Sequence, residues 1–399
     1  MSKCLQLTEL HQIFDCDEVQ ASESIPASSH DGSSPLTPAL PAEIVVSILE
    51  SAYERDNSQK TLAACALVCR DWSVAAQKIL YRRVSLASAP ALDGFVYAVS
   101  QGTPRSRMLS ETVQYLRLVL DAKQPRGIPC NAFSHAVARC PNLAELSLAV
   151  YDDSSKSDAS PTQEPSKPAS PLFSDETLSL LRTGPRVAAL RFDNWSSNAH
   201  ALAQLLEAFP ALSALSVSGT APALPSHALP APRALHSLRL NFQTSPSLEF
   251  VKWLVQDSSL RALEFARMPD CESLMHLLLE HCGSLESLAL PSCAAADYVL
   301  ALAQCTSLRE LRIEDLWTAP NVRLQLPPSL ECIAFALDKR SALGPVVDAV
   351  KKSASLSRVA MHVWAEGAQH SLLPDLRIAC AMQGVELDVV QGIHEFRAL

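Results

Sequence analysis

The stretch LRALEFARMPDCESLMHLLLEHCGSLESLAL, residues 260–290, decides how the greater part of the chain folds. Apolar residues at positions i, i+3 and i+5 open and close it: Leu260, Leu263 and Phe265, then Leu285, Leu288 and Leu290. Because side chains alternate along a strand, each triplet predicts a short strand with one apolar face. Between the triplets, Glu272–His281 has the periodicity of a helix. The stretch therefore predicts alternating strands and helices with a period of 25 residues.

The same triplet occurs ten times. Its first residues are Val113, Leu143, Val187, Leu212, Leu235, Leu260, Leu285, Leu308, Leu330 and Leu356. Seven of the nine steps span 22–26 residues, and the step of 44 contains a Ser- and Pro-rich insertion at 152–171, which we expect to be disordered. The period resembles that of leucine-rich repeats, whose units bury their apolar faces against their neighbours. We predict an α/β solenoid over residues 87–399, with parallel strands and with helices on the convex side.

The repeats are degenerate. Eight residues after the first position, leucine-rich repeats carry Asn or Cys, which satisfies backbone groups in the turn; in this chain only Cys293 does so. This departure puts the asparagine ladder in doubt and leaves the strand pattern intact.

The predicted strands have a second face, formed by positions i+2, i+4 and i+6, which points away from the core. Its residues are mostly small and polar, with scattered charges of both signs. We expect this face to bind a folded protein, and we assign substrate binding to Arg239, Arg312 and Arg358, because arginine is favoured at interface hot spots. A merely solvated face is the alternative. Loops at the strand ends, or the C-terminal segment Val385–Leu399, could hold the partner instead.

The N-terminal part differs in texture. Residues 1–38 are rich in Ser, Pro, Asp and Glu, and we expect a disordered leader. The stretch LPAEIVVSILESAY then begins an amphipathic helix at Pro41. Two further helical stripes and a short strand follow up to Leu86, and we expect Trp72 to be a core residue. Three short helices form a module too small to be very stable alone.

Residues 39–86 resemble an F-box. The matching residues are Leu40, Pro41, Glu43, Ile44, Ile48, Leu49, Leu67, Val68, Cys69, Arg70, Trp72, Leu80 and Tyr81. The polar stretch Glu54–Lys60 is longer than the F-box pattern has. The resemblance implies that the apolar residues in excess of a three-helix core bind a SKP-family adaptor. The residues assigned to this contact are Leu40, Pro41, Ile44, Ile48, Leu67, Val68 and Cys69.

An F-box followed by leucine-rich repeats implies the substrate-recognition subunit of an SCF-type cullin–RING E3 ubiquitin ligase. The F-box would bind the adaptor, the repeats would bind a protein substrate, and the chain would contribute no catalytic group. A scaffold that binds the adaptor without delivering a substrate for degradation is the alternative. A third possibility is an enzyme with an unrecognised site.

Composition narrows these classes. With 33 Lys and Arg against 42 Asp and Glu, the net charge is −9 and no basic run stands out, which argues against nucleic-acid binding. No G-x-G motif and no apolar run of about 18 residues occurs, so we expect neither a nucleotide cofactor nor a membrane span. The N-terminus lacks the features of a signal peptide, which predicts a cytoplasmic or nuclear protein with reduced cysteines.

The twelve cysteines include no C-x-x-C pair. Cys271, Cys282, Cys293 and Cys305 are evenly spaced, but the repeat register explains this spacing better than a metal site does. Cys140, Cys282 and Cys305 each lie three residues before a repeat apolar residue, where a small buried side chain is needed. We therefore expect no metal and no cofactor.

Overall fold

The computed structural model describes residues 40–56, 59–121, 123–151, 172–225, 234–292, 296–316 and 326–397. The predicted leader 1–38 and insertion 152–171 lie outside these residues, as does Cys293. The chain divides into two compact units. Unit 1 is Met1–Ala188 with Trp195–Ser197, and unit 2 is Ala189–Asn194 with Asn198–Leu399.

Unit 1 combines a helical N-terminal part with the first three strands. Its elements are α2 Ala42–Asp56, α3 Gln59–Cys65, α4 Arg70–Arg82, β1 Arg83–Leu86, α5 Ala89–Ser100, α6 Pro104–Thr112, β2 Tyr115–Asp121, α7 Phe133–Ala138, β3 Glu145–Tyr151 and α8 Asp175–Thr183. Strand β1 pairs in parallel with β2, and β2 pairs in parallel with β3. The side chains of Ser88 and Thr103 cap α5 and α6 by accepting backbone hydrogen bonds, and each helix has Pro in its first turn.

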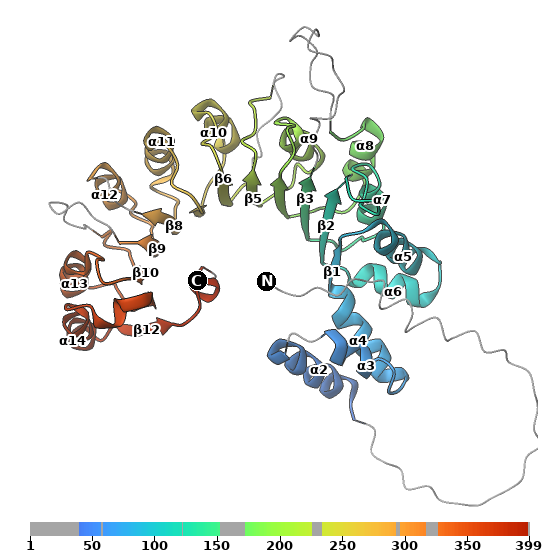
Figure 1. Cartoon of the computed structure of the whole chain (residues 1–399), viewed down its shortest axis with the longest axis horizontal. Helices are drawn as coiled ribbons and strands as arrows, with labels where there is room; N and C mark the ends of the chain where they lie inside the picture. The colour runs from blue at the N-terminus through green and yellow to red at the C-terminus, as the bar shows by residue number, and fades with distance from the viewer. Residues whose placement is uncertain are drawn as a thin grey trace, which may run out of the picture. The chain divides into compact units, whose positions relative to one another are not determined.

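Unit 2 repeats a strand and, in most repeats, a helix. Its elements are β4 Ala189–Asn194, α9 Ala201–Ala208, β5 Ala214–Gly219, β6 Ser237–Phe242, α10 Leu248–Val255, β7 Ala262–Phe265, α11 Cys271–His281, β8 Ser287–Ser292, α12 Ala296–Ala303, β9 Glu310–Asp315, β10 Cys332–Leu337, α13 Leu343–Lys352, β11 Arg358–Val363, the 3-10 helix η2 Ala365–Gln369, α14 Leu373–Gln383, β12 Glu386–Val390 and α15 Ile393–Phe396. Each strand pairs in parallel with the next. Helices α10–α14 line one side of this sheet, and α15 lies on the other (Figure 1).

The triplet pattern is confirmed as the core. All thirty triplet residues are buried, and none is more than 6% exposed. The register places triplet residues beside one another: Phe335 of β10 lies between Ile313 of β9 and Met361 of β11. Strands alternate with helices along the chain and pair in parallel, with the helices on one side of the sheet. This arrangement fits the predicted repeat architecture.

Within the described residues, two strands and four α-helices extend the predicted pattern. Strand β1 was expected only as the end of the N-terminal module, whereas it is the first strand of the parallel sheet. Strand β12 was not predicted, because Gly384 stands three residues before Leu387, where the triplet requires an apolar residue. Helices α5, α6, α14 and α15 were also not predicted.

Serine side chains join successive units of the sheet at a different position of the repeat from the asparagine ladder. Ser284, Ser307, Ser329 and Ser355 each stand immediately before a repeat leucine. Their hydroxyls donate hydrogen bonds of 2.7–2.9 Å to backbone carbonyls one unit earlier, at Leu260, Gly283, Leu308 and Leu330 respectively. We call these four residues the serine ladder. It gives a hydrogen-bond donor to four backbone carbonyls that lie just before strands β7, β8, β9 and β10.

We expect Ser329→Ala to lower the free energy of unfolding by about 1 kcal/mol, because it leaves the carbonyl of Leu308 without its 2.7 Å donor. Urea unfolding followed by circular dichroism measures the change. Ser371→Ala, at an exposed serine in a turn, is the control and should have almost no effect. An equal effect of both substitutions would contradict a role for the ladder.

Candidate protein interfaces

The first helix of the N-terminal module turns two isoleucines to solvent. On α2, Val45 and Leu49 are 3% and 1% exposed, whereas Ile44 and Ile48 are 47% and 46% exposed. Residues four apart share one face of a helix, so the two pairs form two adjacent stripes, of which only one is needed for the core. Exposure of the other stripe leaves a pair of β-branched apolar side chains free for a partner.

The remaining residues assigned to adaptor binding are exposed as well. Leu40 and Pro41 precede α2, and the carbonyl of Pro41 accepts the backbone N–H groups of the helix's first turn. Leu67 and Val68 lie in the turn between α3 and α4 and are 61% and 64% exposed, and Cys69 follows at the start of α4. Below, the N-terminal apolar residues are Leu40, Pro41, Ile44, Ile48, Leu67 and Val68.

Trp72 differs from the expectation. It is only partly buried, so its prediction as a core residue is wrong. Helix α4 begins at Arg70, so Trp72 lies in its first turn, and Ala75, Ala76 and Ile79 supply the buried stripe instead. Trp72 therefore lies at the edge of the N-terminal module.

Several contacts hold the N-terminal apolar residues on a fixed support. Arg82 at the end of α4 forms a 2.8 Å ion pair with Glu50 of α2. Arg105 of α6 donates a 3.0 Å hydrogen bond to Gln77 of α4. The ring of Tyr81 stacks on Phe95 of α5, with 6.4 Å between centroids. These contacts tie α2 and α4 to each other and to the following helices of unit 1.

Unit 2 has a polar groove on the strand face, which is the side of its sheet opposite the helices. The groove has a volume of about 360 Å³. Its polar and charged lining residues are Ser237, Arg239, Glu264, Ser287, Glu310, Arg312, Cys332, Arg358 and Arg397. The three arginines predicted for substrate binding are therefore brought to one groove, and a fourth, Arg397, joins them from the segment after β12.

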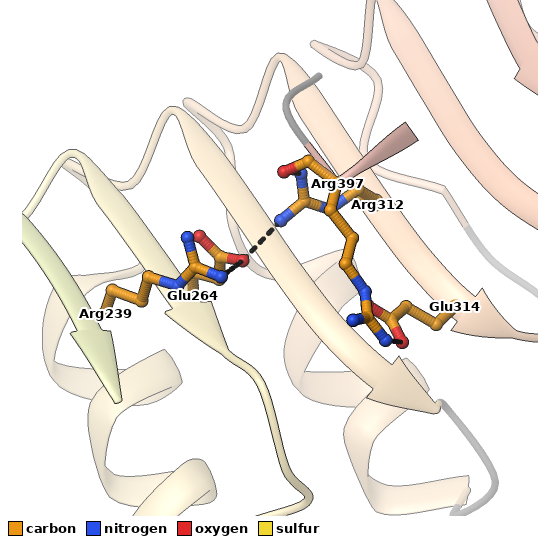
Figure 2. A network of polar contacts seen from close by, with 5 residues as sticks. All are labelled: Arg239, Glu264, Arg312, Glu314 and Arg397. Atoms are coloured by element: carbon orange, nitrogen blue, oxygen red, sulfur yellow. Dashed lines mark hydrogen bonds and ion pairs between the residues drawn. The ribbon is translucent and has the colours of Figure 1, made fainter. Parts of the chain in front are cut away.

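An ion-pair network crosses the groove (Figure 2). Glu264 of β7 accepts from Arg312 of β9 at 2.6 Å and pairs with Arg239 of β6 at 3.4 Å. Arg239 and Glu264 are register partners on adjacent strands. Arg312 reaches Glu264 past Ala289 of β8, which is the register partner of both. The small alanine side chain leaves room for the guanidinium to cross that strand.

Two further ion pairs lie on this face. Arg397 donates to both carboxylate oxygens of Glu314 on β9, at 2.7 and 2.8 Å, and this hydrogen bonding raises the pKa of Arg397. Arg358 of β11 donates to Asp388 of β12 at 2.6 Å, which likewise raises the pKa of Arg358. Burial raises the pKa of the Cys332 thiol in the same groove, so this thiol is protonated at neutral pH.

The three arginines were predicted from the sequence, whereas their ion-pair partners were not. Glu264 could have been found, because the repeat register alone places it beside Arg239 on the next strand. Glu314 and Arg397 could not, because their contact depends on how the chain turns after β12. Arg239 and Arg312 thus belong to one intramolecular network and Arg358 to a separate ion pair with Asp388, and contact of the three arginines with a substrate stays a prediction.

We expect Arg312→Ala to lower the free energy of unfolding by roughly 1.5–3 kcal/mol, since its side chain is 11% exposed and its hydrogen bonds involve charged groups. Arg239→Ala should cost less than about 1 kcal/mol, because that side chain is 43% exposed and its ion pair is longer. Denaturant titration of both variants tests this order. Equal costs would show that Arg312 is no more structural than Arg239.

Two of the other cysteines that the structure describes are packing residues. Cys140 and Cys305 are fully buried and donate to helix carbonyls four residues earlier, and burial raises the pKa of their thiols to about 12 and about 11. Within the described ranges, no three His, Cys, Asp or Glu side chains are grouped so that they could hold a metal ion. Nor is any helix of those ranges long and apolar enough to cross a membrane.

Comparison with known proteins adds one finding. A family model described as F-box-like matches residues 37–87. No curated protein matches the chain. The match contains all seven residues assigned to adaptor binding. It ends one residue after β1, so it covers helices α2, α3 and α4 and strand β1. In residues 37–87, therefore, this chain is similar to the F-box-like family.

Proposed function

We propose that this chain is a substrate-recognition subunit of an SCF-type cullin–RING ubiquitin ligase. Residues 37–87 bind a SKP-family adaptor, and the strand face of unit 2 binds a protein substrate. The observation that carries the proposal is the exposure of the N-terminal apolar residues within a region that matches the F-box-like family.

The proposal has physical support, because exposing these apolar side chains to water is unfavourable unless a partner covers them. Four of them, Ile44, Ile48, Leu67 and Val68, are each between 46% and 64% exposed. Exposed apolar side chains gathered in one small module mark interaction sites, because a partner that covers them removes apolar area from water. The module presents them on helix α2 and one turn, and such anchors supply most of the binding energy of an interface.

The mechanism needs no catalytic group from this chain. An adaptor bound to one unit and a substrate bound to the other would be held non-covalently on the same polypeptide chain. Linkage replaces a bimolecular encounter by an intramolecular one, so the substrate's lysines are present at a high effective concentration near the conjugating enzyme. The rate gain then depends on both interfaces at once.

Co-purification of the full chain from cells distinguishes the candidate functions. Recovery of the adaptor together with cullin and RING subunits supports a ligase subunit. Recovery of the adaptor alone supports the scaffold alternative. Absence of the adaptor, from a chain that is folded by circular dichroism, contradicts both.

A further inference from the structure

The segment after β12 turns back over the strand face. Residues 391–397, which we call the tail, contain α15, and α15 packs against β11 and β12 on the side opposite the helices (Figure 1). The tail therefore occupies part of the surface that the sequence assigned to substrate binding.

One aromatic side chain anchors the tail. Phe396 is fully buried, in a cluster with Ala334, Ala360 and Val390, and Ile393 packs beside it. Ala334 and Ala360 lie in the same row across the sheet as Arg312, but their small side chains leave a hollow there. The ring of Phe396 fits there because two neighbouring strands contribute only a methyl group each.

Two more aromatic groups form the wall of this hollow. The imidazole of His362 stacks on Phe396 with 5.9 Å between ring centroids, and Trp364 meets His362 edge-on at 5.4 Å. The Nδ1 of His362 lies 3.0 Å from the carbonyl of Val390, and because a carbonyl only accepts, Nδ1 is the donor. This hydrogen bond fixes the imidazole plane against which the phenyl ring rests.

The residue after the aromatic anchor is held by charge. Glu314 receives the Arg397 guanidinium through two parallel hydrogen bonds, the geometry in which arginine is read most specifically. Arg312 in turn donates to the carbonyl of Arg397 at 2.5 Å, so it fixes the backbone of the tail as well as Glu264 (Figure 2). Hollow, carboxylate and donor together recognise an aromatic residue followed by arginine.

The tail is weakly tied for a segment of its length. Phe396 is its one buried side chain among 391–397, whereas Gln391, His394, Glu395 and Arg397 are exposed. A helix of four residues is not stable in isolation, so its order depends on the face beneath it. Holding the tail down costs backbone and side-chain entropy over all seven residues, against the burial of one ring and a few polar contacts. A competing segment with the same contacts can therefore replace it.

We propose that the tail is an internal ligand of the strand face, and that this face binds a protein segment in which an aromatic residue is followed by arginine, the bound segment displacing the tail. The partner's aromatic ring takes the place of Phe396, its arginine pairs with Glu314, and the residues after it run into the 360 Å³ groove beside Arg312 and Arg239. The assignment of this segment to a ligase substrate rests on the proposed function; the exchange of tail and segment does not.

The test uses the synthetic peptide GIHEFRAL, the sequence of residues 392–399, labelled with a fluorophore. Its binding is measured by fluorescence anisotropy to the full chain and to a variant that ends at Val390. We expect saturable binding to the shortened variant and at least tenfold weaker binding to the full chain, whose own tail competes. Peptides carrying Phe396→Ala or Arg397→Ala should bind the shortened variant at least tenfold more weakly.

A double-mutant cycle tests whether the arginine of the peptide pairs with Glu314. In the shortened variant, Glu314→Ala should remove the difference in affinity between the unaltered peptide and the peptide that carries Arg397→Ala. The control Arg377→Ala, at an exposed arginine of α14, should leave that difference unchanged. Equal binding of the unaltered peptide to the full and shortened chains would overturn the proposal, and so would absence of binding to a shortened chain that is folded.

If the shortened chain does not fold, the full chain carrying Phe396→Ala with Arg397→Ala takes its place. Unfolding of that variant as well would mean that the tail is a fixed part of the core, and the proposal would be wrong. Adaptor binding is measured on the same preparations. Loss of adaptor binding with the peptide results intact contradicts the proposed function alone, whereas the converse result contradicts only the internal ligand.

Discussion

The double substitution Ile44→Asp with Ile48→Asp is expected to lower the affinity for a SKP-family adaptor by at least about 1,000-fold while the chain stays folded. Each anchor at the centre of an interface contributes about 2 kcal/mol or more on truncation, and each 1.4 kcal/mol is a factor of ten in affinity. A carboxylate placed there adds the cost of removing its charge from water. The fold should persist because Val45 and Leu49, and not these isoleucines, fill the core.

Titration calorimetry with purified adaptor measures the loss, and circular dichroism checks the fold. The matched control is Ile378→Asp on α14, where an isoleucine of similar exposure, 56%, lies in unit 2. It should leave adaptor binding unchanged. The milder variant Leu40→Ala with Pro41→Ala should also lose adaptor pull-down. Wild-type affinity in the Ile44 and Ile48 variant would refute the F-box assignment.

Phe335→Ala is expected to lower the free energy of unfolding of the full chain by about 3–5 kcal/mol. The ring is fully buried in β10, between Ile313 and Met361 on the neighbouring strands, so its removal opens a cavity that rigid strands cannot close. A loss of this size is a large part of the stability of a typical domain. Urea unfolding monitored by circular dichroism provides the measurement.

Phe335→Leu is the matched control, because leucine occupies the equivalent third position at Leu118, Leu148, Leu240 and Leu290. We expect it to cost clearly less than the alanine variant. If the two substitutions lower the free energy of unfolding equally, the side chain at position 335 is not tightly packed, contrary to what its burial implies.

The strands were predictable from the sequence because each one depends on a local pattern. The positions of Leu285, Leu288 and Leu290 are apolar in every unit, because in every unit these side chains are buried against the neighbouring units. The exposed isoleucines of α2 were predictable on similar grounds, since three short helices cannot bury every apolar side chain that the segment carries.

The charged and aromatic contacts of the strand face were not predictable in the same way. Arg312 meets Glu264 two strands away and Arg397 from beyond β12, so the contacts join residues 48 and 85 positions apart. No periodic pattern encodes a return of the chain across its own sheet. The burial of Phe396 could not be predicted for the same reason. A lone aromatic residue near a helical turn has no periodicity from which burial can be inferred.

The serine ladder also explains how units of unequal length can belong to one array. Each ladder serine fixes the position at which a unit starts, one residue before its leucine, and places no condition on the length of the helix or loop that comes next. Consecutive ladder serines are accordingly 23, 22 and 26 residues apart. After duplication or deletion of a whole unit, each ladder hydroxyl would face a backbone carbonyl near the start of its new neighbour, so the array can be lengthened or shortened during evolution without leaving a gap in its hydrogen bonding.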